Sequence, residues 1–152
     1  MKDKAARPKP QEVIFSDFDD TVGEIVTKLI SKYHPELATA KFHHICRSKA
    51  SKKAGKLTPG NMYKMSGKWK HLIGVDFVSE IALDCWNNFE PNQRTAILDH
   101  LLSRCVGTED AENGEMKWSL RPPEVQEFPE VAERNGQWND SLIEISKCLT
   151  KK

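Results

Sequence analysis

The chain has 152 residues, of which 38% are hydrophobic and 30% charged, and its mean hydropathy is −0.60. This length suits one compact domain and excludes two full enzyme domains, and no apolar run reaches the roughly 18 residues that a membrane span needs. Residues 1–70 carry 15 basic and 7 acidic side chains, whereas residues 71–152 carry 8 and 15. The sequence therefore predicts a molecule with a strong charge dipole.

The N-terminus is rich in Lys and Pro, so residues 1–12 are predicted to form a flexible basic tail ahead of a single domain over residues 13–152. This tail lacks the apolar stretch of a signal peptide, and the four cysteines form no Cys-x-x-Cys pair. These features favour a cytoplasmic protein with free thiols and no membrane partner.

The first half of the chain carries one clear helix and several short strands. Apolar residues at helical spacing predict a helix over residues 21–34, and a β-type run follows at residues 41–47. Residues 48–55 are expected to be flexible. The Pro-Gly and Ser-Gly turn signals within residues 57–74 predict a hairpin or meander.

The second half is richer in helices. Residues 77–86 have the pattern of a strand that turns toward a helix, and residues 91–105 form the predicted central helix. Asn113 and Gly114 predict a hairpin turn. Two more helices are expected near residues 123–134, with a kink at Pro129, and 140–149. The fold class is α+β, with a short, twisted antiparallel sheet packed against the central helix and flanking helices.

The strand that ends in Asp17-Phe18-Asp19-Asp20-Thr21 resembles the first motif of haloacid-dehalogenase-type phosphatases. The resemblance implies Asp17 as the nucleophile toward phosphate and Asp19 as the general acid, with Mg²⁺ between them. However, the rest of the chain does not alternate strands and helices as a doubly wound sheet requires. Acids at the start of the first helix, capped by Thr21, explain the string without catalysis. We place this function last among the alternatives.

A stretch without a single acidic residue runs from Leu37 to Val75. Lysines with interleaved aromatic residues are suited to contact phosphates and to stack on bases. The alternative is a solvated loop and edge hairpin whose charges prevent sheet aggregation. The candidate nucleic-acid contacts in the 41–70 region are Lys49, Lys52, Lys53, Lys56, Lys64, Lys68 and Trp69.

Several spaced segments resemble the metallopeptidases encoded by bacteriophages, a family that looks like minimal zincins. The matching segments are the helix from Gln93 to Arg104, the stretch from Arg121 to Phe128 and the stretch from Arg134 to Trp138. Upstream, residues 32–37 and 76–78 also look like family segments. The resemblance covers most of residues 20–140 and implies a minimal zincin-like fold.

The residues that would carry zincin chemistry are replaced in this sequence. A zincin helix holds Zn²⁺ with two His at i and i+4, and a Glu at i+1 takes a proton from the metal-bound water. Here His100 matches the first ligand, but Leu101 takes the place of the base and Arg104 that of the second ligand. The third ligand is replaced by Pro123. We therefore expect no zinc, no other cofactor and no peptidase activity from these positions.

The role of the remaining His100 is open to three interpretations. It is a partly buried histidine of the relic pocket, a ligand of a rebuilt metal site, or part of a new partner surface. A rebuilt site could draw on His43, His44, Cys46 or Cys105, although strand alternation lets at most two of the first three share a face. Asp99 is expected to pair with Arg94 or Arg104 on its own helix.

The sequence favours a catalytically inactive, metallopeptidase-like protein that acts by binding. The leading partner is a host bacterial protein, bound in host takeover or counter-defence. A candidate contact face is acidic and comprises residues 108–115 with Glu124, Glu127, Glu130 and Glu133. The alternatives are nucleic-acid binding by the basic 41–70 region and a zinc peptidase with unusual ligands.

Overall fold

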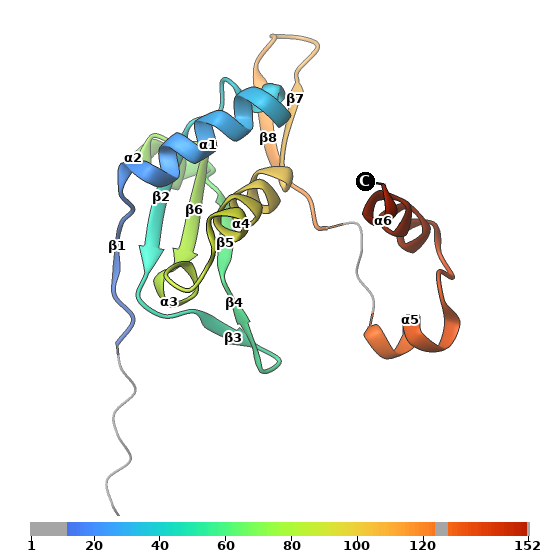
Figure 1. Cartoon of the computed structure of the whole chain (residues 1–152). Helices are drawn as coiled ribbons and strands as arrows, with labels where there is room; N and C mark the ends of the chain where they lie inside the picture. Colours follow the sequence, from blue (N-terminus) through green and yellow to red (C-terminus); the bar gives the residue numbers. More distant parts are fainter. Residues whose placement is uncertain (1–11, 124–127, 152) are drawn as a thin grey trace, which may run out of the picture. The chain divides into compact units, whose positions relative to one another are not determined.

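The structure of the chain is a computed structural model that describes residues 12–123 and 128–151. The chain forms two compact units, Met1–Leu120 and Arg121–Lys152. The first unit combines small β-sheets with α-helices, so the predicted α+β class is confirmed (Figure 1). Among the described residues, no helix is long and apolar enough to cross a membrane.

A four-stranded sheet forms the centre of the first unit. Its strand order is β1 (Phe15–Asp17), β2 (Phe42–Arg47), β6 (Phe77–Ala82) and β5 (Gly60–Lys64). The β2 and β6 strands run parallel, whereas β1 and β5 pair antiparallel at the two edges. The prediction of an antiparallel sheet is therefore wrong at its centre. The long connection between β2 and β6 returns the chain to the same end of the sheet, as a parallel pair requires.

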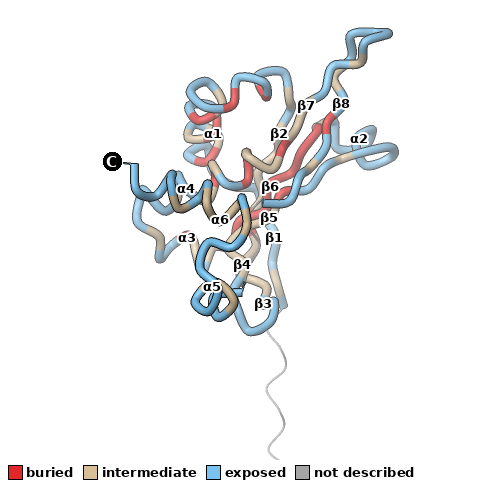
Figure 2. Tube along the Cα trace, turned by 90° about the vertical axis from the view of Figure 1, so that its right-hand side faces the viewer, coloured by how far each residue is buried: buried red, intermediate tan, exposed pale blue. Residues whose placement is uncertain are grey.

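Two helices cover one face of this sheet. They are α1 (Asp20–Tyr33) and α4 (Pro91–Ser103), with the short elements η1 (Pro35–Leu37) and α3 (Leu83–Trp86) beside them. Their apolar stripes meet β6 in one core, whose fully buried members include Val22, Leu37, Phe77, Ile81, Leu98, Leu101 and Leu102. Figure 2 shows the buried β6 strand between α1 and α4 on one side and α2 (Gly67–Ile73) on the other.

The α2 helix is an element that sequence patterns missed. It lies within residues 57–74, where a hairpin or meander was expected, and every one of its residues is exposed. A helix without a buried stripe has no apolar periodicity for a pattern to detect. It is connected to the sheet by the buried Asp76 carboxylate, which lies 3.0 Å from Lys70 Nζ and accepts a 2.8 Å hydrogen bond from the Lys41 amide.

Two hairpins extend from opposite ends of the sheet (Figure 1). The first pairs β3 (Ser51–Lys53) with β4 (Lys56–Thr58), so the expected flexible segment at residues 48–55 is in part a strand. The second pairs β7 (Cys105–Glu109) with β8 (Met116–Leu120), which confirms the hairpin predicted at Asn113 and Gly114.

The second unit contains α5 (Pro129–Asn135) and α6 (Asp140–Thr150). The α6 helix agrees with the prediction of 140–149. Pro129 does not kink α5 but occupies its first turn, where the missing amide hydrogen costs nothing. Among the described residues, the helix predicted over 123–134 begins at Pro129. Residues 124–127 of that prediction lie outside the described residues.

Gly107 provides a test of the packing between β7 and β8. A Cβ atom at Gly107 would lie 2.5 Å from Trp118 Cζ3 and 2.8 Å from Met116 Cε. We expect Gly107→Ala to lower the free energy of unfolding by about 1–3 kcal/mol, because the buried indole cannot move away freely. Urea denaturation measures this loss.

Gly23→Ala is the matched control for this substitution. Gly23 lies within α1, and a Cβ atom there meets nothing within 4 Å. Alanine in a helix interior is more favourable than glycine by about 1 kcal/mol, so this variant should be more stable than the parent chain. Equal losses in both variants would contradict the packing described for Gly107.

Candidate functional site: the α4 helix and its surroundings

The α4 helix and its C-cap residue contain the three positions that correspond to a zincin motif. The side chains at these positions differ in how far they are buried. Leu98, Leu101 and Leu102 face the core, and Leu101 is only 1% exposed. His100 lies on the opposite, exposed side of the helix. Arg104, the C-cap residue, is half-buried and continues the helical backbone conformation. The residue in the place of the base is therefore a core residue.

The donor set on α4 does not fit a zinc ion. Leucine and proline have no donor atom, and the guanidinium of Arg104 stays protonated and carries the same sign of charge as the metal. His100 alone cannot complete a tetrahedral site, which needs three protein ligands even in a catalytic centre. Pro123, in place of the third ligand, belongs to the second unit. The zinc-bound water mechanism of zincins cannot run on these residues.

His100 itself is exposed, so the expectation of a partly buried histidine is wrong. Its ring makes no hydrogen bond to another residue that the structure describes. The buried histidine of this region is instead His34, at the C-terminal end of α1. An exposed imidazole fits the third interpretation, a surface available to a partner.

His34 is the partner of Asp99, and sequence reasoning missed this contact. The His34 Nε2 atom lies 2.6 Å from Asp99 Oδ1, which joins the end of α1 to α4. Arg94 was one expected partner of Asp99, but its guanidinium stacks on Trp86 and donates to the Trp86 carbonyl oxygen at 3.0 Å. Helical spacing could not reveal the pair, because its members are 65 residues apart.

The residues considered for a rebuilt metal site do not gather. His43 lies 2.8 Å from Asp17, and His44 bonds Ser79 Oγ at 2.6 Å. Cys46 lies 3.1 Å from Ser16 Oγ. Within residues 12–123 and 128–151 there is no group of three His, Cys, Asp or Glu side chains that could hold one ion.

Cys105 is further unsuited to metal binding by its protonation state. Burial raises the pKa of this thiol to about 12, although the nearby Arg104 acts in the opposite direction. The thiolate is the form that binds metals. At neutral pH Cys105 therefore stays a protonated core residue, and its Sγ donates to the Leu101 carbonyl oxygen at 3.7 Å.

A cleft of about 810 Å³ lies at the start of α1 and includes Asp17 and Asp19. The β1 strand that ends at Asp17 is an antiparallel edge strand, whereas the phosphatase motif ends a strand of a doubly wound parallel sheet. Asp19 is the N-cap of α1 and accepts a hydrogen bond from the Thr21 amide, so the predicted cap at Thr21 is wrong. Both aspartates have structural partners, and the phosphatase reading is contradicted by the topology.

The structure places the basic candidates in two groups. Lys49, Lys52, Lys53 and Lys56 lie in or beside the β3–β4 hairpin, whereas Lys64 ends β5 and Lys68 and Trp69 lie on α2. All seven side chains are exposed. The β5 edge strand connects the two groups.

His44 predicts how stability depends on pH. Burial, with a smaller contribution from His43, lowers its pKa below the ordinary value of 6.5. The unfolded chain therefore binds this proton more readily, and the stability contributed by neutral His44 is lost as the pH falls below about 6.5. We expect the free energy of unfolding to fall less between pH 7.5 and 5.5 in His44→Gln than in the parent chain. Equal falls in urea titrations would contradict this assignment.

A family model described as "Putative phage metallopeptidase" matches residues 18–147, which include the whole of α1, the sheet from β2 onward and α4. Neither a curated protein nor a solved structure gives a match. Because the match covers most of the chain and includes the helix that carries His100, the chain belongs to the phage metallopeptidase family.

Proposed function

We propose that this chain is a member of the phage metallopeptidase family that acts by binding a bacterial host protein and does not hydrolyse peptides. The observation that carries the proposal is the position of Leu101 in the core, where the catalytic base would stand. Together with the charged Arg104 in place of a ligand, it removes both the base and the metal from the mechanism. The scaffold then remains as a set of surfaces.

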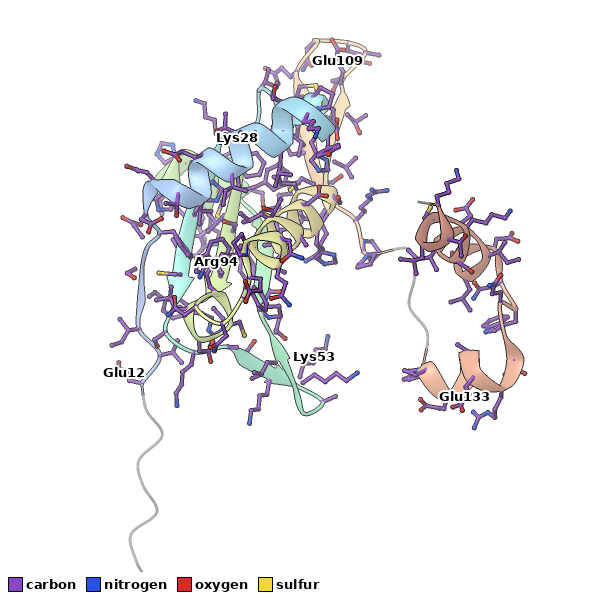
Figure 3. All side chains as sticks on the ribbon, viewed as in Figure 1. Glu12, Lys28, Lys53, Arg94, Glu109 and Glu133 are labelled. Atoms are coloured by element: carbon purple, nitrogen blue, oxygen red, sulfur yellow. The ribbon has the colours of Figure 1, made fainter. Side chains whose placement is uncertain are left out.

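The acidic β7–β8 hairpin is the surface best suited to a protein partner. Glu109, Glu112 and Glu115 are exposed near its tip, and Glu109 marks its place in Figure 3. The turn is ordered by its own hydrogen bonds: the Glu112 amide donates to Asp110 Oδ1 at 2.9 Å and the Glu115 amide to Asn113 Oδ1 at 3.0 Å. A rigid acidic loop loses little freedom on binding and complements a basic surface.

The acidic face expected from the sequence is only partly described. Glu130 and Glu133 are exposed on α5, in the second unit, and Glu124 and Glu127 lie outside the described residues. Asp110 is not one of the free acids of the hairpin. It lies 3.2 Å from Lys117, and the Glu112 amide and this lysine lower its pKa. The exposed glutamates therefore carry the proposed contact.

The first test measures zinc and peptidase activity. We expect purified full-length chain to contain far less than one zinc per chain by mass spectrometry, and chelator to leave the melting temperature unchanged. Peptide hydrolysis should stay at the level of a blank. Stoichiometric zinc whose removal lowers the melting temperature and abolishes hydrolysis would instead establish a zinc peptidase with unusual ligands.

The second test locates the protein contact. Immobilised full-length chain is expected to retain a defined protein from a lysate of the host bacterium. Glu112→Gln/Glu115→Gln should lose most of that protein, because two charges leave the hairpin while its backbone bonds stay. Glu130→Gln/Glu133→Gln, which removes two charges from α5, should retain it. Equal retention by all three baits would refute the hairpin contact.

A further inference from the structure

The lysines of the 41–70 region form a basic edge on the first unit. This edge consists of the β3–β4 hairpin with Lys49, the β5 edge strand that ends at Lys64, and α2 with Lys68 and Trp69. Figure 2 shows α2 on the side of the sheet away from α1 and α4. The α2 part of the edge therefore lies on the opposite side of the sheet from the α4 site, whereas β5 packs against Leu101 at Gly60.

The charge of the basic edge is not neutralised by the protein. Lys70 is paired with Asp76 and Arg47 with Glu80, at 3.0 and 3.3 Å. The six lysines of the edge form no ion pair with any residue in the described part of the chain: Lys49, Lys52, Lys53, Lys56, Lys64 and Lys68. No acidic residue interrupts the sequence from Leu37 to Val75. The edge therefore presents unbalanced positive charge.

The hairpin places like charges opposite each other. Lys53 on β3 pairs directly with Lys56 on β4, so their side chains leave the same face of the hairpin. Like charges at directly opposed positions destabilise a β-ladder. An anion bound between the two ammonium groups would remove this repulsion. Figure 3 shows Lys53 at the tip of this hairpin, away from the rest of the unit.

The length of the edge suits a chain of phosphates rather than one anion. From Lys56 to Lys64 the β4–β5 segment is extended, and eight residue steps of about 3.3 Å span roughly 26 Å. Lysines at both ends of this segment would meet phosphates several nucleotides apart. Single-strand binding sites of about 4–16 nucleotides have this order of length.

Aromatic side chains at the α2 end provide surfaces for bases. Tyr63 on β5 is 42% exposed and Trp69 on α2 is 56% exposed. Lys68 Nζ lies 5.3 Å from the Trp69 ring centroid, so positive charge sits beside a stacking surface. Exposed rings next to unpaired lysines are the combination that holds single strands without sequence preference.

From these observations we propose that the basic edge binds single-stranded nucleic acid, with phosphates along the β3–β4 hairpin and β5 and a base stacked on Trp69. This inference goes beyond the proposed protein contact and uses a different surface. An anionic membrane is the competing partner, because Leu72 and Ile73 on α2 are also exposed. The charges, however, extend along a strand and a hairpin, whereas a membrane-surface helix carries its lysines and apolar residues on one helix.

Fluorescence anisotropy with a labelled oligothymidylate of about 16 nucleotides tests the proposal on the full chain. Six phosphate contacts predict a slope of log affinity against log salt of roughly −4, so affinity should fall by about two orders of magnitude or more between 50 and 200 mM salt. Lys53→Ala/Lys56→Ala should reduce the slope by about 1.4. Lys28→Ala/Lys32→Ala, which removes two charges from α1, should leave the slope unchanged.

Trp69→Ala separates stacking from charge. This substitution should weaken oligonucleotide binding by roughly 5- to 150-fold without changing the salt slope. Leu72→Ala should have little effect on the affinity. The same proteins are added to vesicles that contain phosphatidylserine. Binding to the vesicles without binding to the oligonucleotide would overturn the proposal. So would an equal loss of oligonucleotide affinity in the Lys53/Lys56 and the Lys28/Lys32 double variants. None of these substitutions lies in the acidic hairpin. A failure to bind nucleic acid would therefore not affect the outcome of the protein-contact test.

Discussion

The packing of α4 against α1 and β6 is the constraint on which the rest of the molecule depends. Helical spacing puts Leu98, Leu101 and Leu102 on one buried stripe, and His100 on the opposite side. A side chain at position 101 cannot be both a core residue and a base that contacts a metal-bound water. In this chain the position is filled by a leucine that the core has enclosed.

The same packing also fills the core around the position of the catalytic base. In a zinc-dependent domain the bound ion contributes to the free energy of folding. Here Leu101 and Cys105 add apolar area to the core, and the His34–Asp99 contact joins α1 to α4 across the buried layer.

Charge is distributed unevenly over the first unit. The basic β3–β4 hairpin and the acidic β7–β8 hairpin extend from opposite ends of the sheet, as the labelled Lys53 and Glu109 show (Figure 3). These two ordered hairpins therefore carry clusters of opposite charge. Lys53 and Lys56 lie on the first hairpin, and Glu109, Glu112 and Glu115 are exposed on the second.

Much of the fold could be predicted from the sequence, because α1, α4 and α6 have buried or amphipathic stripes that produce a helical period. The rest depends on long-range or solvent-exposed features. The parallel pairing of β2 with β6 is set by tertiary packing, and α2 has no buried face to give a period. At the site, the resemblance to the family motif identified His100, Leu101 and Arg104, whereas the contact of His34 with Asp99 was missed, because only the fold brings these two residues together.

The most direct measurement is a crystal structure of the full chain grown with zinc, with diffraction recorded on both sides of the zinc absorption edge. We expect no anomalous peak within coordination distance of His100, an exposed imidazole at that position, and a leucine side chain packed in the core at position 101. A strong peak coordinated tetrahedrally by His100 and two further protein donors at about 2.0–2.3 Å would contradict it.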